Sequence, residues 1–172
     1  MSKPIINVAN ITFEASSPMF APTGSVAERF EAKTGMIGAR IGAHKLGYNI
    51  TAVPPGKRAW PFHNQPAKEE MFFVLQGKGA VRIGEATYPI RTGDFIACPA
   101  GGRETAHQII NTGTEELRYL AVSVESSLEM AEYPDSGKFA MKAELGTAAD
   151  GKPQRFVFVG RANQSLNFWD GE

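Results

Sequence analysis

The sequence has little that would take the protein out of the class of small globular domains. A single cysteine, Cys98, excludes an internal disulfide framework and indicates a reducing compartment. The 18 Lys and Arg residues balance 18 Asp and Glu residues, so no long-range field attracts a nucleic acid or an anionic membrane. No stretch approaches the roughly 18 apolar residues of a transmembrane helix, and the amino terminus lacks a signal peptide's apolar core. We therefore expect a cytoplasmic protein without nucleic-acid or membrane partners.

Glycine and proline, by contrast, are plentiful and divide the chain into short segments. There are 18 glycines and 11 prolines, a pattern typical of strands and turns. From Leu46 onward apolar residues alternate with a period of two, first in LGYNITAV and then in further short segments that end at Gly, Pro or Asn. RIGEAT has the composition of a tight hairpin. These features predict an all-β chain folded as an antiparallel sandwich or barrel.

The change of period suggests three parts of the chain. Residues 1–45 are predicted to form an amino-terminal extension, with a strand near residues 11–13 and a short helix over residues 25–33, where Ser25 and Glu28 could make a capping box. Residues 46–125 form the predicted barrel core. Residues 126–172 form a carboxy-terminal extension with two peripheral strands. Because Phe168 and Trp169 are costly to leave in water, we expect this extension to pack on the barrel or on a neighbouring subunit.

The stretch PFHNQPAKEEMFFVLQG has the spacing of a known barrel family. Six residues separate Gly56 from His63, Gln65 follows His63 by two, four residues precede Glu70, and six more lead to Gly77. With its second histidine position taken by Gln65, this run resembles the first motif of the cupin superfamily, small antiparallel double-stranded β-helix barrels. Within that superfamily, the chain resembles a single-domain subgroup likened to sugar-phosphate isomerases.

A second run resembles the second motif of the same family. Gly93, Pro99 and Gly101 match in register, five residues rather than two then precede His107, and Asn111 follows at the expected distance. Both motifs in order, separated by a hairpin of the right length, predict the double-stranded β-helix (jelly-roll) fold with amino- and carboxy-terminal extensions.

The resemblance implies a divalent-metal site formed by His63, Gln65, Glu70 and His107. In extended backbone, residues i and i+2 point to the same face, so His63 and Gln65 can both face the barrel interior. Pro66 interrupts the extended segment, so the alternation of inward and outward side chains cannot be counted from Gln65 to Glu70. The choice of Glu70 over Glu69 therefore rests on the resemblance alone.

Gln65 bears on which metal would bind. An amide oxygen is a harder and weaker donor than imidazole, which disfavours Ni, Cu and Zn relative to earlier metals. Mn, Fe or Zn is expected, with Ni also allowed. An empty polar pocket stays open as the alternative.

If Glu70 faces inward, every second residue of its strand follows it. The opposite face then carries large apolar side chains that should not be left in water. Either the terminal segments cover this face or a second subunit does, and we favour a homodimer. The inward residues are Glu70, Phe72 and Val74, and the outward ones are Met71, Phe73 and Leu75.

Three further residues are candidates for substrate binding. Arg103 lies in the inserted GGRET, where a guanidinium near the barrel mouth could clamp a carboxylate or phosphate. An ordinary surface arginine paired with Glu104 is the alternative. Phe72 and Trp60 are candidate pocket-lining residues, although the sequence leaves open whether Trp60 faces the pocket or the outer sheet.

Two functions remain open, because the fold does not name the reaction. In the first, the protein is a metal-dependent enzyme, of isomerase or dioxygenase type, acting on a small oxygenated metabolite such as a sugar phosphate or a carboxylate. In the second, the barrel binds a small-molecule ligand without turnover, as a sensor or accessory module, with an empty or structural metal site.

Overall fold

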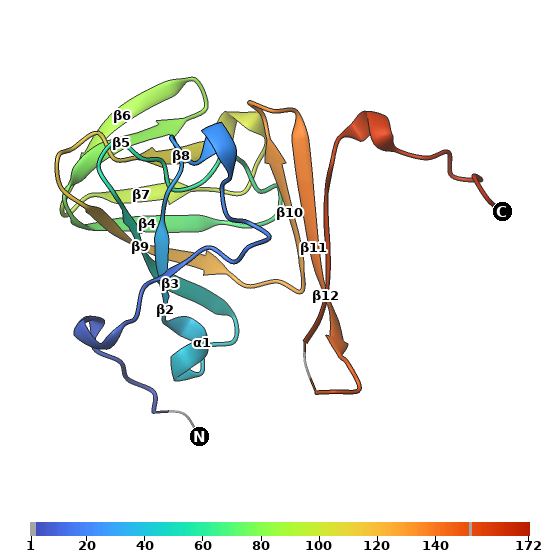
Figure 1. The fold of residues 1–172 in the computed structure, drawn as a ribbon, viewed down its shortest axis with the longest axis horizontal. Helices are drawn as coiled ribbons and strands as arrows, with labels where there is room; N and C mark the ends of the chain where they lie inside the picture. Colours follow the sequence, from blue (N-terminus) through green and yellow to red (C-terminus); the bar gives the residue numbers. More distant parts are fainter. Residues whose placement is uncertain (1–2, 152) are drawn as a thin grey trace.

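The computed structural model describes residues 3–151 and 153–172, and its regular structure is mostly β, as predicted (Figure 1). Short helical segments occur at α1 (Gly38–Ile41) and in 3-10 turns at Val8–Asn10, Gly24–Val26, Arg103–Thr105 and Ala162–Gln164. The strands are β1 (Glu14–Ala15), β2 (Lys33–Met36), β3 (Leu46–Val53), β4 (Glu70–Gln76), β5 (Lys78–Ile83), β6 (Ala86–Arg91), β7 (Phe95–Cys98), β8 (His107–Ile110), β9 (Leu117–Val124), β10 (Leu128–Tyr133), β11 (Lys138–Thr147) and β12 (Pro153–Gly160).

Two antiparallel sheets form the barrel. One has the order β1-β2-β3-β9-β4-β7 and the other β6-β5-β8. Strands distant in sequence are therefore neighbours, as in the pairing of β3 with β9 and of β5 with β8. The hairpin predicted at RIGEAT joins β5 to β6, with Ile83 opposite Ala86. The predicted double-stranded β-helix is confirmed.

The barrel interior is filled by alternate residues of both sheets. Phe72 and Val74 of β4 are buried there, as their phase with Glu70 predicted. Cys98 belongs to the same cluster, and burial raises the pKa of its thiol to about 12, so it acts as a small apolar side chain. The cluster comprises Val53, Ala59, Phe72, Val74, Val81, Ile90, Ile96, Cys98, Ile109, Leu117 and Tyr119.

The outer face of the larger sheet is covered in part by the amino-terminal segment. Ile11 and Ile37 join Ile50 in a second buried cluster, against which Leu75 of β4 packs. Phe73 instead contacts the ring of Phe95, with centroids 4.4 Å apart, and Phe95 is 71% exposed. Other segments of the same chain therefore cover some of the outward-facing side chains of β4.

The helix predicted over residues 25–33 is wrong. The chain forms only the 3-10 turn Gly24–Val26 and then extends into β2, whose residues pair with β3. An isolated helix of this length is marginal, whereas the edge of β3 offers backbone hydrogen-bond partners. The predicted amino-terminal strand lies slightly later, at Glu14–Ala15, and α1 was not foreseen.

The carboxy-terminal segment forms a third sheet, β10-β11-β12, beside the barrel, with three strands where two were predicted (Figure 1). The last residues lead away from the barrel, and Phe168 and Trp169 are 85% and 73% exposed. Their rings contact each other, with centroids 5.0 Å apart. Of the two alternatives predicted, the barrel and a neighbouring subunit, this tail does not lie on the barrel, and its packing on a second subunit stays a prediction. No helix among the described residues is long and apolar enough to cross a membrane.

Candidate metal centre

Two histidines distant in sequence are brought together by a backbone bridge. The His63 N–H donates to the His107 carbonyl at 3.2 Å, and the His107 N–H donates to the His63 carbonyl at 2.8 Å. Residues paired in this antiparallel way project their side chains to the same side. The two ring centroids are accordingly 4.7 Å apart.

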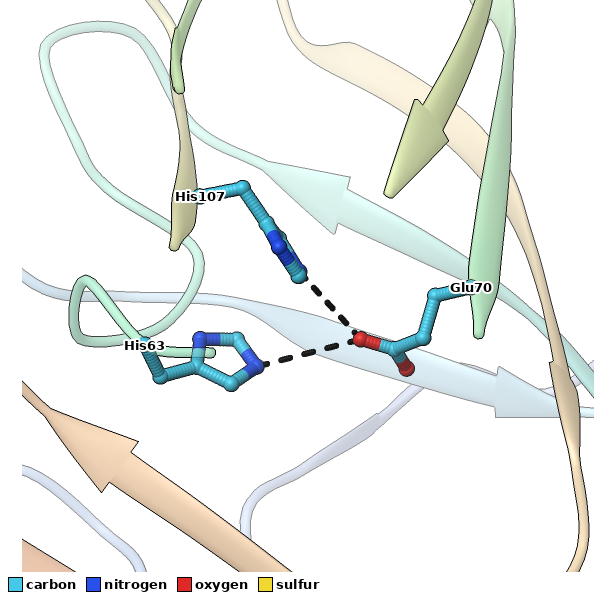
Figure 2. A group of neighbouring side chains, drawn as sticks. All are labelled: His63, Glu70 and His107. Atoms are coloured by element: carbon cyan, nitrogen blue, oxygen red, sulfur yellow. Dashed lines mark hydrogen bonds and ion pairs between the residues drawn. The ribbon is translucent and has the colours of Figure 1, made fainter. Parts of the chain in front are cut away.

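Glu70, the first residue of β4, completes the cluster from the facing sheet (Figure 2). Its Oε2 lies 3.2 Å from His107 Nε2 and 3.8 Å from His63 Nε2. One ligand atom from each of the three residues lies within 4.8 Å of the others. The side chains are largely buried, with 5% of His107 and 16% of Glu70 exposed, so competing water is scarce.

The hydrogen bonds of the two rings leave both Nε2 atoms facing the carboxylate. His63 Nδ1 lies 2.8 Å from the Pro61 carbonyl, and His107 Nδ1 lies 3.3 Å from the Thr105 carbonyl. A carbonyl only accepts, so Nδ1 carries the proton and Nε2 of a neutral ring carries a lone pair. Two lone pairs and a carboxylate oxygen then face one another. A cation between them, a metal ion or an added proton, satisfies all three.

The electrostatics favour the protonation states of metal ligands. Burial, followed by the charge of His107, lowers the pKa of His63 and keeps that ring neutral. Burial alone would raise the pKa of Glu70, but the hydrogen bond with His107, together with neighbouring positive charge, outweighs it and leaves the pKa below its ordinary value. A neutral imidazole and an ionised carboxylate are the forms that bind divalent metals.

A cavity of about 290 Å³ opens in front of the cluster. His63 and Glu70 line it together with polar residues of β2 and β3, where Thr51 Oγ1 donates to Asn49 Oδ1 at 3.1 Å. Trp60 and Phe72, both singled out in the sequence, belong to its apolar wall. The lining residues are Thr34, Asn49, Thr51, Trp60, Pro61, His63, Glu70, Phe72, Tyr119, Ala121 and Tyr133.

Gln65 lies on a neighbouring cavity rather than on this one. That second cavity, of about 220 Å³, lies against the carboxy-terminal sheet and shares His63 and Tyr133 with the first. Gln65 lines it with Glu129 and Lys142 among others. A place for Gln65 among the metal ligands therefore stays a prediction.

Arg103 is held on the outside of the site. Its Nε and Nη2 lie 2.9 and 2.8 Å from Glu132 Oε1, and its side chain is 68% exposed. It does not line the cavity in front of the cluster. The partner expected from sequence, Glu104, instead accepts a hydrogen bond from the Gly102 N–H. The role of Arg103 as an anion clamp stays a prediction, and its ion pair with Glu132 speaks against it.

Several cavity residues were not singled out from the sequence. Asn49 and Thr51 share a face of β3 with the buried Val53, so the period-two pattern could have located them. Tyr133, by contrast, comes from β10, outside both motifs. Its sheet is tied to the ligand loop by two backbone hydrogen bonds between Asn64 and Glu132, each 3.0 Å long. No local pattern signals such a contact.

Comparison with known proteins finds a family match within the barrel. Residues 49–123 match the family model described as the cupin domain, and these residues include His63, Glu70 and His107. This segment of the chain is therefore similar to the cupin superfamily. An oxalate-binding protein from Thermotoga maritima is 31% identical to this chain over 72 residues, which are 42% of this chain and 56% of that protein. The chain spans about half the length of the curated relatives it matches.

Two crystal structures share the fold over almost the whole chain. A sugar phosphate isomerase of the cupin superfamily from Silicibacter pomeroyi superposes with a TM-score of 0.76, covering 97% of this chain and 98% of that chain at 22% identity. A proposed sugar phosphate isomerase from Acidithiobacillus ferrooxidans also gives 0.76, covering 96% of each chain at 21% identity. At these identities the likeness shows the fold, including its terminal extensions, and not the activity.

Proposed function

We propose that this protein is a metal-dependent enzyme that acts on a small oxygenated metabolite, by isomerisation or oxygenation. The observation that carries the proposal is the convergence of two imidazoles and one carboxylate, with ligand atoms within 4.8 Å of one another, where His63 and Glu70 line a cavity. Three protein donors that face a ligand cavity are typical of catalytic rather than structural metal sites.

The donor set fits Mn, Fe(II) or Zn, and Ni is also allowed. When bound, the ion would polarise a carbonyl or hold two neighbouring oxygens of the substrate. The chain prepares this chemistry through the carbonyls of Pro61 and Thr105. Each accepts a hydrogen bond from Nδ1 of one histidine ring, which directs Nε2 of that ring towards the candidate site. Trp60 and Phe72 would exclude water around the reacting group. Gln65 is proposed as a further, weaker ligand.

The names of the fold neighbours favour isomerisation of a sugar-type substrate, since two of them are described as established or proposed sugar phosphate isomerases. Such a reaction needs a Lewis acid and a base, and no redox change at the metal. Oxygenation of a carboxylate would instead need iron or another redox metal.

Binding without turnover is a second candidate, favoured by the match to an oxalate-binding protein. A dicarboxylate can present two oxygens to the open positions of an ion at the cluster. In that case the protein would be a sensor or accessory module, and the cavity residues would recognise the ligand without transferring a proton.

Metal analysis of protein expressed without added metals, followed by titration with Mn, Fe(II), Zn and Ni under thermal unfolding, tests the metal site. We expect at least one of these metals to raise the unfolding temperature. Incubation of the loaded protein with aldoses and ketoses, read by NMR, then separates the candidates, because interconversion supports the enzyme and tight oxalate binding without turnover supports the sensor. No bound metal and no thermal shift would contradict the enzyme and favour binding without turnover at an empty site.

We also propose that the protein is a homodimer. Large apolar side chains are exposed on the carboxy-terminal sheet and tail, including Phe156, Phe158, Leu166, Phe168 and Trp169. An exposed apolar group of this size is typical of an interaction surface.

A further inference from the structure

We infer that the substrate is an uncharged polyhydroxylated molecule, such as a free monosaccharide or polyol, and that phosphorylated sugars are excluded from the cavity. The inference rests on the proposed function, since it assumes that the cavity in front of His63 and Glu70 is the substrate site. It goes beyond that function by choosing between the substrate classes that the family and the fold neighbours leave open.

The first observation is the charge of the cavity wall. Among the described residues that line it, none is a lysine or an arginine, and Glu70 is the one charged side chain. A bound divalent ion would leave a net charge of about +1 with Glu70, concentrated at the ion itself. The rest of the wall therefore has no group that could pair with a phosphate at the other end of a substrate.

The cations that lie nearby are already paired with carboxylates. Lys68 Nζ lies 3.0 Å from Glu129 Oε1, and these side chains are only 14% and 20% exposed. Lys142 Nζ lies 3.5 Å from the other oxygen of Glu129. Arg103 is bound to Glu132. Recruiting one of them to a phosphate would break an ion pair and leave a partly buried carboxylate without its partner.

A phosphate at the end of the substrate that does not contact the ion would consequently lose its water without gaining a charged partner. Phosphate recognition in proteins relies on arginine forks, lysines or backbone N–H groups at a helix terminus. The lining strands and loops provide neither of the first two, and the one α-helix among the described residues, α1, contributes no lining residue. The desolvation cost of the anion is therefore not offset.

The second observation is a row of uncharged hydrogen-bonding groups on the inner face of β2 and β3. Thr34 and Thr51 are cross-strand partners, and Asn49 lies two residues before Thr51 on the same face. All three line the cavity. Because Thr51 Oγ1 already donates to Asn49 Oδ1, a sugar hydroxyl can donate to the Thr51 oxygen, accept from the Asn49 amide nitrogen, and either donate to or accept from Thr34. The apolar Trp60 and Phe72 supply surface for its carbon skeleton.

The volume agrees with a ligand of this size. About 290 Å³ lies at the lower end of the range of roughly 300–1,000 Å³ for small-molecule sites, so the cavity suits a small metabolite better than a cofactor-sized one.

The test compares matched ligands on the metal-loaded protein. Neutral pentoses and hexoses and the terminal monophosphates of the same sugars are titrated into Mn-loaded protein by calorimetry. We expect at least one neutral sugar to bind and its phosphate to bind more than about tenfold more weakly. Equal or tighter binding of the phosphate overturns the inference, as does binding of neither class. Because metal loading is measured first, failure to bind Mn or another metal is seen separately and contradicts the proposed function as well.

Variants of the row of uncharged hydrogen-bonding groups, Thr34, Asn49 and Thr51, make the test specific. Thr34→Val should weaken binding of the neutral sugar by about five- to tenfold, because one hydrogen bond is lost, and should leave metal affinity unchanged. Thr51→Val provides a second variant of the row. Thr87→Val, an exposed threonine of β6, is the matched control and should change nothing. Unchanged sugar affinity in both row variants would overturn the recognition role, and a parallel loss of metal affinity would indicate a structural effect instead.

Discussion

Replacing Glu70 by Gln should separate metal binding from folding. The substitution keeps the shape of the side chain and an oxygen that accepts from His107, but it removes the charge. In the metal-free protein, where an added proton on His107 Nε2 makes this hydrogen bond, the bond loses the charge of the carboxylate, which costs about 1 kcal/mol of the free energy of unfolding. Loss of an outer partner of a metal ligand already costs about 10–100-fold in affinity, so loss of a direct carboxylate ligand should cost about 100-fold or more.

The two effects differ enough to be measured in one thermal assay. At a metal concentration of about 100 times Kd, binding stabilises the wild type by about 2.7 kcal/mol. At the same concentration the variant, with Kd about 100-fold higher, gains only about 0.4 kcal/mol. For a chain of this length, about 2–4 °C per kcal/mol gives a metal-dependent rise in Tm of about 5–11 °C for the wild type and about 1 °C for the variant.

Circular dichroism melts with chelator and with Mn²⁺ would provide these shifts. Glu69→Gln is the matched control, since Glu69 is the exposed neighbour that sequence spacing alone could not separate from Glu70. It should keep the full metal-dependent shift. A wild-type-sized shift in Glu70→Gln, or loss of the shift in Glu69→Gln, would refute the assignment of Glu70 as a ligand.

Four further outcomes are expected. Gln65→His should raise affinity for Ni and Zn relative to Mn if the side chain faces the ion, measured by competition with a chromophoric chelator; an unchanged metal preference would remove Gln65 from the ligands. In the metal-free protein, the free energy of unfolding should fall as pH drops below 6.5. In the folded protein the pKa of His63 lies below its ordinary value of 6.5, so the unfolded chain binds this proton more readily. Below pH 4.5, the lowered pKa of Glu70 further decreases the free energy of unfolding. Urea titrations across this range check it, and stability that rises on acidification would contradict it. Asn111→Ala should lower the free energy of unfolding by about 3 kcal/mol, because the buried amide makes three hydrogen bonds, while metal affinity stays the same. Finally, light scattering should show a dimer that Trp169→Ala weakens, and a monomeric wild type would refute the dimer.

The strand pattern and the barrel could be predicted because their signals are local. Alternation along β4 places Phe72 and Val74 inside from neighbouring residues alone, and turn residues mark the hairpin between β5 and β6. The predicted helix over residues 25–33 failed for the converse reason. Its local capping signal was outweighed by pairing of the following residues with β3, a partner that local sequence does not reveal.

The candidate site was predictable only in part. Spacing and family resemblance selected His63, Glu70 and His107, which the fold brings together. The same reasoning chose Arg103 as an anion clamp, because an arginine in an inserted loop resembles a substrate ligand. Its pairing with Glu132 depends on how β10 packs beside the loop, and no spacing rule predicts that packing.

The sequence by itself determined the all-β class, since side-chain alternation is a property of adjacent residues, and motif spacing together with the family resemblance pointed to His63, Glu70 and His107 as candidate donors. Only the tertiary structure decided the direction of the imidazole nitrogens, the neutral wall of the cavity and the pairing of the nearby cations. Each of these depends on contacts between residues far apart in the chain, such as the backbone bridge between His63 and His107. Those contacts form only when the two sheets close on each other.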